Sequence, residues 1–407
     1  MPALPTPICP RVAFVTSHPI QYQVPIFRHL AERSDIDFHV LFAQIPEAAQ
    51  QGDGFGVSFT WDVPLLEGYS FEVLENVANK PSVTEFAGCD TPAIAERLHD
   101  FDAVIVNGWV VKTCLQALRA CRLRRIPCIV RGEANHLRPR AWWKRLLQRQ
   151  LVRQFSAYLY IGSANRDFYT SYGVRDEQLF PARYCIENER FLDASLDRSR
   201  RTRARQIWAI PDNATTFLYC GKFIEKKHPL ELLRAFAEVT NHESNIHLLM
   251  VGDGELRPEA EALVSNLRLP VTFTGFLNQS EIVDAYLASD CLVLPSDHGE
   301  TWGLVVNEAM ACGLPAIVSD QAGCSRDLIS EGVTGFTFSF GDWPQLVDRM
   351  KRAASVPHHL VEMGRNAQEQ IREYSPAAAA DGFVNAAHFV ARTGRRRPRP
   401  QLVDAAT

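Results

Sequence analysis

Two glutamates eight positions apart, Glu300 and Glu308, are the side chains of this 407-residue chain best placed to do chemistry. Glu300 follows an apolar run at 291–294, and Glu308 lies in an apolar helical pattern expected from Gly303 to Gly313. A carboxylate in the loop after a strand can accept hydrogen bonds from sugar hydroxyls, and one on the helix can hold the ribose diol of a nucleotide. The helix start behind Gly303 offers N–H groups that suit a phosphate. The alternative is a surface loop and a helix with one exposed glutamate, but the strand, turn and helix context favours a ligand site.

This arrangement needs a buried strand followed by a helix, and the chain repeats that unit throughout. Short apolar runs alternate with segments of helical period, which is the pattern of a parallel sheet covered by helices on both faces. The pattern pauses at a polar, arginine-rich stretch over 193–205, which indicates a linker or a surface helix. We therefore predict two doubly wound α/β domains in tandem, with a cleft where the carboxyl ends of both sheets face each other. The expected strands are 12–15, 38–41, 103–106, 127–130, 158–161, 216–219, 247–251, 271–273, 291–294 and 315–318.

Composition excludes several classes of protein. A formal net charge of -4 argues against binding of nucleic acid by the whole surface, and 46% hydrophobic content argues against disorder. The ten cysteines are scattered without a C-x-x-C pair, so neither a zinc site nor a disulfide framework is indicated. The first ten residues lack the features of a signal peptide, and no apolar run approaches the length of a membrane span. We expect a cytoplasmic location.

Charge is unevenly distributed along the first half. Acidic residues dominate 47–100, whereas basic residues dominate 119–153. Within 141–155, tryptophans and leucines recur at three- and four-residue spacing between lysines and arginines, which predicts a basic amphipathic helix. Such a helix can lie on an anionic membrane surface. The alternative, favoured because apolar stripes usually face cores, is a helix that covers the sheet.

The stretch from Glu300 to Glu308 resembles the retaining glycosyltransferases of family 4, which have the GT-B fold and carry two glutamates separated by seven residues. The resemblance is strong over about 216–338 and weaker before it. It implies two Rossmann-like domains facing across a cleft. The first, over 1–191, would bind the acceptor, and the second, over 192–375, would bind the donor. A helix over 376–391 would pack back on the first domain, and we expect a disordered tail over 393–407.

The resemblance also implies roles for residues of the second domain. Glu300 would contact the donor sugar and Glu308 the ribose. Lys222 stands where the family usually has an arginine on the donor diphosphate, and Lys227 matches its lysine. Two cations there would stabilise a diphosphate leaving group most in the transition state, whereas the alternative is a solvated lysine cluster. The backbone that would lie along the sugar and diphosphate is that of Thr301, Trp302, Gly303 and Leu304.

The first half departs from the family pattern at two loops. His18, Gln21 and Gln23 follow the first strand, where many members have a glycine-rich loop, and they either bind acceptor hydroxyls or serve the turn. Glu133 stands where many relatives have a histidine facing the reacting sugar, so that role is not carried over. His136 is a second candidate for it.

The function implied is retaining transfer of a hexose-like sugar from a nucleotide-sugar donor to a hydroxyl group of a glycan, a lipid-linked or a small-molecule acceptor. This reaction would serve glycan, polysaccharide or glycolipid synthesis, with no metal, no other cofactor and no nucleic acid. The protein would be cytoplasmic, with a possible peripheral site on the inner face of the membrane through 141–155. One alternative is a nucleotide-sugar epimerase or hydrolase of the same fold. Another is a non-catalytic donor-binding partner subunit, suggested by Lys222 and Glu133.

Overall fold

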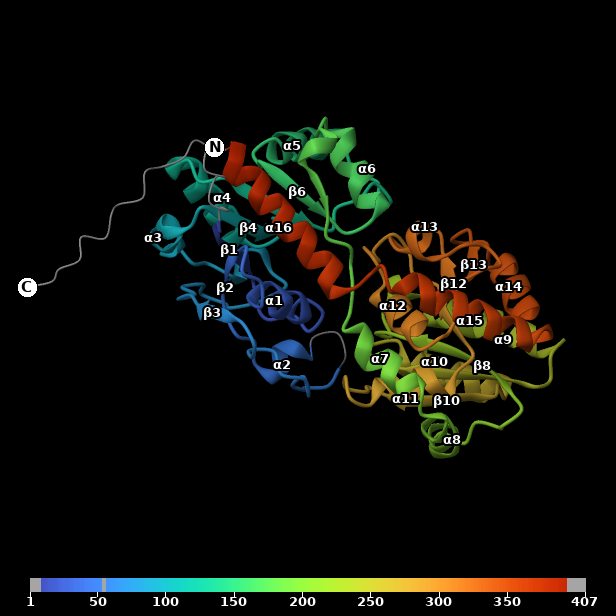
Figure 1. The fold of residues 1–407 in the computed structure, drawn as a ribbon. Coiled ribbons are helices and arrows are strands. Elements are labelled where there is room, and N and C mark those ends of the chain that lie inside the picture. The colour runs from blue at the N-terminus through green and yellow to red at the C-terminus, as the bar shows by residue number, and fades with distance from the viewer. Residues whose placement is uncertain (1–8, 53–55, 394–407) are drawn as a thin grey trace, which may run out of the picture.

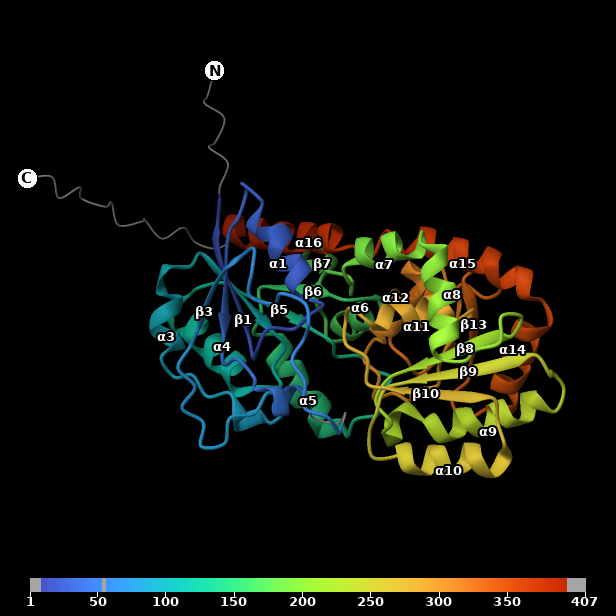
Figure 2. The ribbon, with the colours of Figure 1, turned by 90° about the horizontal axis from the view of Figure 1, so that it is seen from below.

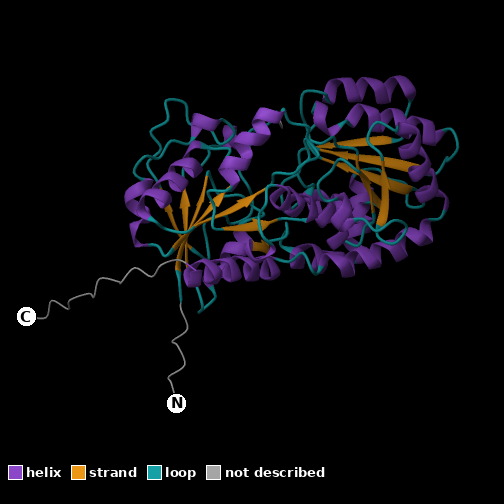
Figure 3. Ribbon diagram, turned by 90° about the horizontal axis from the view of Figure 1, so that it is seen from above, coloured by secondary structure: helices purple, strands orange, loops and turns teal. Residues whose placement is uncertain are grey.

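Two parallel sheets, each with helices on both faces, make up the molecule (Figure 1). The computed structural model describes residues 9–52 and 56–393, so the predicted tail beyond Thr393 lies outside the described residues. Coloured by secondary structure, the two sheets lie side by side, each between layers of helices (Figure 3). This arrangement confirms the predicted pair of doubly wound domains.

The first sheet has the strand order β3-β2-β1-β4-β5-β6-β7, and all of its described pairings are parallel. The five strands predicted for this half are present. The edge strands β3 and β7 were not predicted, because each is short and at most one residue of each is buried. The strands are β1 (Arg11–Thr16), β2 (Asp37–Phe42), β3 (Ser70–Val73), β4 (Ala103–Asn107), β5 (Cys128–Gly132), β6 (Ala157–Tyr160) and β7 (Leu179–Pro181).

The last helix of the chain belongs to the first sheet. Helix α16 (Pro376–Thr393) lies against α1, β6 and β7, and Figure 2 shows it crossing from the second domain to the first. Phe383 packs in the core beside Phe14, with 5.9 Å between ring centroids. The other helices around this sheet are α1 (Val24–Ala31), α2 (Ala48–Gln51), α3 (Ile94–Arg97), α4 (Lys112–Arg124), α5 (Trp142–Val152) and α6 (Ser163–Ser171).

The second sheet has the strand order β10-β9-β8-β11-β12-β13, again with parallel pairings. The strand β13 was not predicted. The strands are β8 (Thr215–Cys220), β9 (Ile246–Val251), β10 (Val271–Gly275), β11 (Cys291–Leu294), β12 (Ala316–Ser319) and β13 (Gly335–Phe338). The helices are α7 (Asn188–Ser195), α8 (Arg198–Ile207), α9 (Pro229–Thr240), α10 (Arg257–Leu267), α11 (Ile282–Ala288), α12 (Leu304–Ala311), α13 (Ser325–Leu328), α14 (Trp343–Ser355) and α15 (Pro357–Ile371).

The polar stretch over 193–205 forms the end of α7 and most of α8, a helix that its arginines fasten to α11. Arg201 donates hydrogen bonds to the carbonyls of Leu287 and Ser289, and Arg205 donates to that of Ala288. These carbonyls lie at the carboxyl end of α11, where the helix leaves them without intrahelical partners. The arginines therefore cap one helix while they anchor another.

Helix α5 corrects the expectation that the stripe over 141–155 faces the core. Trp142 is 73% exposed and Leu147 is 64% exposed, whereas Val152 is the buried residue of the helix. Phe155, just after the helix, is buried in the first core. The Tyr172 hydroxyl donates a hydrogen bond to Gln148, and the last turn and the residues after it pack on the domain. The apolar side chains of the first two turns remain exposed to solvent. In the described ranges, no helix is long and apolar enough to cross a membrane.

Candidate active site

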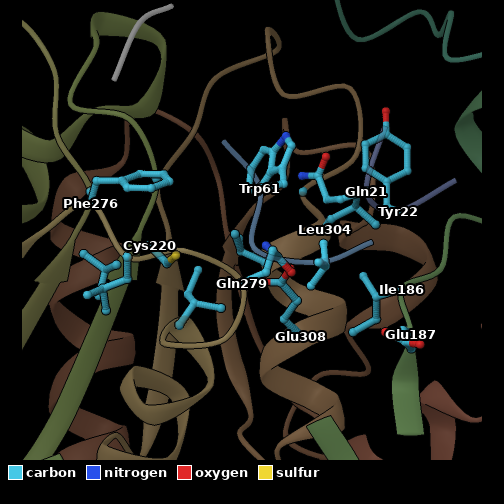
Figure 4. Close-up of a pocket in the computed structure, with 18 of the residues that line it drawn as sticks. Gln21, Tyr22, Trp61, Ile186, Glu187, Cys220, Phe276, Gln279, Leu304 and Glu308 are labelled. Atoms are coloured by element: carbon cyan, nitrogen blue, oxygen red, sulfur yellow. The ribbon is translucent and has the colours of Figure 1, made fainter. Parts of the chain in front are cut away.

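A pocket lies between the two domains at the carboxyl ends of their sheets (Figure 4). It encloses about 220 Å³. Most of its walls come from loops after β8, β9, β10 and β11 and from α12, and a smaller part comes from the first domain. Its lining comprises Gln21, Tyr22, Trp61, Val63, Ile186, Glu187, Arg190, Cys220, Gly221, Lys227, Val251, Gly252, Phe276, Leu277, Gln279, Ile282, Glu300, Gly303, Leu304, Val305 and Glu308.

Two glycines let the loops after β8 and β9 meet at the pocket wall. Gly252 has a φ of +124°, and a Cβ on it would lie 2.0 Å from the carbonyl oxygen of Gly221. A side chain at position 252 would therefore separate the two loops. The same loop after β8 continues into a short 3-10 turn, Glu225–Lys227, which places Lys227 at the pocket.

Lys227 and Glu300 form an ion pair inside the pocket. The Lys227 ammonium group donates a hydrogen bond to the Glu300 carboxylate, and each side chain is only 14% exposed. The loop that carries Glu300 is held in turn by the hydrogen bond from the Gly323 amide to the Glu300 carbonyl, at 3.1 Å. Partial burial strengthens the attraction between the two charges, so the ammonium group is held in place before any ligand arrives.

Glu308 lies on α12 and is almost fully buried. It is 8% exposed and accepts a 2.5 Å hydrogen bond from the Tyr286 hydroxyl. Burial raises the pKa of the Glu308 carboxyl above its ordinary value. At the start of α12, Gly303 has a φ of +108°, and a Cβ there would lie 2.7 Å from a methyl carbon of Leu294. The first N–H groups of α12 have no acceptor within the helix and favour an anion at the pocket.

Glu133 of the first domain uses both of its carboxylate oxygens, one of them across the domain boundary. One oxygen accepts a hydrogen bond from the Thr301 hydroxyl at 2.9 Å, and the other accepts from the Tyr184 hydroxyl. Tyr184 also contacts Tyr22, with 3.2 Å between the two hydroxyl oxygens. Burial, together with the nearby Glu133 charge, raises the pKa of Tyr184 well above its usual range. Glu133 therefore ties the loop that carries Glu300 to the first domain.

Several predicted residues lie near the pocket without lining it. The side chain of Trp302 is 3% exposed and faces the first domain, where a Cβ on Gly162 would lie 2.2 Å from its ring. Its indole N–H donates to Asn307 at 2.8 Å. Lys222 and Thr301 are in the predicted loops but outside the lining, so the structure brings Lys227, Glu300, Gly303, Leu304 and Glu308 together.

The candidates of the first domain are also divided. Gln21 lines the pocket, whereas Gln23 is 1% exposed and occupies the N-cap position of α1 within the core, without a side-chain capping hydrogen bond and not at the cleft edge. His18 pairs with the Ser17 hydroxyl at 2.8 Å, and burial lowers the pKa of His18 to about 4. His136 is bonded to Ser171 of α6 at 2.7 Å and packs against Phe168, away from the Glu133 carboxylate contacts.

Sequence reasoning missed two prominent residues of the lining. Arg190 of α7 donates to the Gln279 side chain at 2.5 Å, and its charge lies close enough to Glu308 to lower that carboxyl's pKa against the effect of burial. Trp61 enters from a loop of the acidic segment 47–100, where no hydrophobic period marks it. For Arg190 a signal existed, since it lies one residue before position 191, where the first domain was predicted to end.

No group of three His, Cys, Asp or Glu side chains within residues 9–52 and 56–393 is arranged to hold a metal ion. The expectation that the reaction needs no metal and no other cofactor stays a prediction. So do the individual roles expected for the lysines and glutamates.

Comparison with known proteins gives one family and many similar structures. Residues 200–370 match the model of the glycosyl transferases group 1. The chain is 29% identical over 242 residues to the alpha-D-kanosaminyltransferase of Streptomyces kanamyceticus, covering 58% of this chain and 60% of the relative. It is 33% identical over 192 residues to the sulfoquinovosyl transferase SQD2 of Arabidopsis thaliana, covering 46% of this chain and 36% of the relative. The chain thus matches less than two thirds of the length of each.

Among solved structures, the Anabaena protein Alr3699/HepE in complex with UDP and glucose superimposes with a TM-score of 0.70. The superposition covers 92% of this chain and 98% of that one, at 17% sequence identity. Such a likeness covers both domains and the orientation of one sheet to the other. Together with the two parallel sheets, it confirms the predicted GT-B fold.

Proposed function

We propose that this chain, which has the GT-B fold and whose residues 200–370 match the model of the glycosyl transferases group 1, moves a sugar from a nucleoside diphosphate donor to a hydroxyl group of an acceptor. One observation carries the proposal. A single pocket gathers Lys227, Glu300 and Glu308 from three separate segments, beside the start of α12. These groups match the parts of a nucleotide sugar, which has a diphosphate, sugar hydroxyls and a ribose diol.

The donor diphosphate lies between Lys227 and the amino end of α12, with Lys222 of the same loop nearby. When the bond to the sugar breaks, negative charge grows on the diphosphate, and fixed positive groups stabilise that state more than the ground state. The ion pair with Glu300 keeps the Lys227 ammonium group oriented at the pocket. Glu300 then accepts hydrogen bonds from the sugar, and Glu308 accepts them from the ribose.

The acceptor enters from the first domain, beside Gln21 and Tyr22. His18 is uncharged at neutral pH because its pKa is lowered to about 4, so the nearby imidazole can exchange a hydrogen bond with an acceptor hydroxyl without adding charge. In the proposed retaining route, an oxygen of the departing diphosphate takes the proton of the acceptor hydroxyl. The new bond then forms on the face that the leaving group vacates, so the anomeric configuration is kept.

The test is a donor panel of UDP-, GDP- and ADP-hexoses, with nucleotide release measured with and without a mixture of sugar and lipid acceptors. Transfer requires release that depends on the acceptor and a product with the donor's anomeric configuration, read from its proton NMR coupling constant. Release without acceptor would indicate a hydrolase, and sugar interconversion without release an epimerase. Donor binding without any turnover would indicate a non-catalytic subunit and would overturn the enzyme proposal.

We also propose that α5 places the protein on an anionic membrane, which favours a lipid-linked acceptor. Its exposed tryptophans and leucines lie beside Lys144, Arg145 and Arg149. Next to them is a shallow hollow lined partly by Arg138, Arg140 and Lys144, a group of cations suited to lipid phosphates. Tryptophan at the headgroup level with basic residues on phosphates is the pattern of a helix that lies in the interface.

Vesicle flotation tests this membrane site. The wild-type protein should float with vesicles that contain phosphatidylglycerol and much less with pure phosphatidylcholine. The double variant Trp142→Ser/Leu147→Ser should stay at the bottom with both, while its melting temperature is unchanged because both side chains are exposed. A matched control is Leu196→Ser, which removes an 80% exposed leucine far along the chain. Equal flotation of the double variant and the wild type would contradict the proposal.

A further inference from the structure

One loop of the first domain reaches across the cleft and attaches to the second. This strap, residues 59–63, lies against the loop 276–280 that follows β10. The Asp62 carboxylate accepts hydrogen bonds from the Ser280 amide, at 3.1 Å, and from the Ser280 hydroxyl. Asn278 donates to the Thr60 carbonyl at 2.8 Å. The strap is therefore fastened to the donor domain by side chains of both partners.

Aromatic rings continue the contact into the pocket. Phe59 lies on Phe276, with 4.2 Å between ring centroids and 31° between ring planes. Trp61 meets Phe59 edge to face at 4.8 Å. Trp61 and Phe276 both line the pocket, and Figure 4 shows their rings above Cys220 and Gln279. A first-domain tryptophan thus forms part of the wall of a pocket built mainly by the second domain.

The sheet order indicates which part of a ligand reaches these rings. Glu300 follows β11, whereas Phe276 follows β10, and β8 and β9 lie between those two strands. Three strand spacings separate the two loops by about 14 Å. That distance suits the length of a nucleoside diphosphate sugar. With the sugar and diphosphate at Glu300 and Lys227, the nucleobase falls at the β10 side.

The chemistry of the β10 side suits a base. It is lined by the apolar side chains of Val251, Phe276, Leu277 and Ile282. The Arg190 guanidinium borders this side, where hydrogen bonds to Gln279 hold it. A nucleobase is a flat group with an exposed π-face, and stacking on an aromatic side chain is favourable for every base. Trp61 offers a large indole surface at that end.

We infer that Trp61 is the first domain's contact to the donor nucleotide, covering a face of the nucleobase at the β10 side of the pocket. The inference rests on the proposed function and adds a base-binding residue to it. Because stacking uses the π-face and not the edge of the base, Trp61 supplies affinity for the nucleotide without choosing between uracil and guanine. The hydrogen bonds between Asp62 and Ser280 hold the strap on the second domain. Trp61 therefore reaches the nucleobase only while these bonds are formed.

Isothermal titration of the full chain with UDP, GDP and inorganic pyrophosphate tests this assignment. Trp61→Ala should weaken UDP and GDP binding by a similar factor, about 5- to 100-fold, and should leave pyrophosphate binding unchanged because pyrophosphate has no base. Trp61→Phe should recover most of the loss. Asp62→Asn combined with Ser280→Ala, which loosens the strap, should weaken both nucleotides by a smaller factor.

The matched control is Phe86→Ala, which removes a 51% exposed aromatic side chain of the first domain outside the pocket lining and should leave all three affinities unchanged. If Trp61→Ala binds UDP and GDP as the wild type does, the assignment of Trp61 is wrong while the proposed function stands. A loss of pyrophosphate binding in Trp61→Ala would also overturn it, since the residue would then act on the whole pocket. If the wild type binds no nucleotide, the proposed function fails first and this inference with it.

Discussion

The two halves of the pocket are built in different ways. In the half proposed to bind the donor, called the donor half, Lys227 and Glu300 lie in loops after strands of one domain and Glu308 lies on α12, and Gly252 and Gly303 set the local backbone geometry. In the half proposed to bind the acceptor, called the acceptor half, side chains from three separate loops of the first domain reach the cleft, and bonds across the domain boundary hold them. The geometry of the donor half thus depends on short-range chain geometry, whereas that of the acceptor half depends on how the domains meet.

The largest difference between the halves should appear when a charge of the donor half is removed. Lys227→Ala should lower kcat about 10²- to 10³-fold, the usual cost of losing one group that stabilises transition-state charge. Lys227→Arg should recover part of the rate because it keeps the charge but changes the geometry. Steady-state kinetics and a melting curve measure the two effects separately. A wild-type rate in Lys227→Ala would show that the donor half is wrongly assigned.

A smaller effect is expected from the carboxylate that joins the halves. Glu133→Gln keeps acceptor capacity but removes the charge that Thr301 and Tyr184 hydrogen-bond to, a loss of about 1.5–3 kcal/mol. If this energy positions the loop of Glu300, kcat should fall about 10- to 100-fold while the affinity for UDP changes little. Equal losses in kcat and in UDP affinity would instead place Glu133 in the donor half. Thr301→Val, which removes the hydroxyl donor, serves as the matched partner variant.

The smallest effect concerns Glu308, where stability and binding should oppose each other. Because burial raises the pKa of this carboxyl in the folded state, its contribution to stability is greatest at low pH and is lost as the pH rises through the raised value. Glu308→Gln should therefore be more stable than the wild type at pH 8, by about 1 kcal/mol, with the difference vanishing near pH 4. The same variant should bind UDP about tenfold more weakly if the carboxylate holds the ribose.

Urea unfolding at pH 8 and pH 4, with UDP titration of both proteins, checks this prediction. A variant that is less stable than the wild type at pH 8 would show that the charge at position 308 is well compensated in the folded protein. In that case the Tyr286 hydroxyl and the nearby Arg190 outweigh burial.

Sequence patterns predicted the donor half and the fold because both depend on local signals. Buried parallel strands are nearly continuous apolar runs in the sequence. The turn between β11 and α12 is predicted by Gly303 and the residues next to it. The short edge strands β3 and β7 carry no such run. Trp61 lay beyond prediction since its position depends on contacts with Asn278 and Ser280, more than 200 residues away in the chain.

Helix α5 shows a different limit. Its period correctly predicted an amphipathic helix, but a period does not say which side of a helix meets the protein. Because most apolar stripes face a protein core, we expected the stripe of α5 to be buried. In the structure, Val152 at the end of α5 is the buried residue of the helix. Only tertiary contacts decide between a stripe that packs on a sheet and a stripe that meets another surface.

The position of α16 has a consequence for how the chain is made. Phe383, Val384 and Val390 of α16 form part of a hydrophobic core of the first domain. The last strand of that domain's sheet, however, ends at Pro181. A ribosome that adds about 5–20 residues per second takes roughly 10–40 s to cover the ~200 residues between them. During that time the apolar groove that α16 later fills stays open on the nascent chain. The domain synthesised first is thus the one that finishes folding last, after the second domain has emerged.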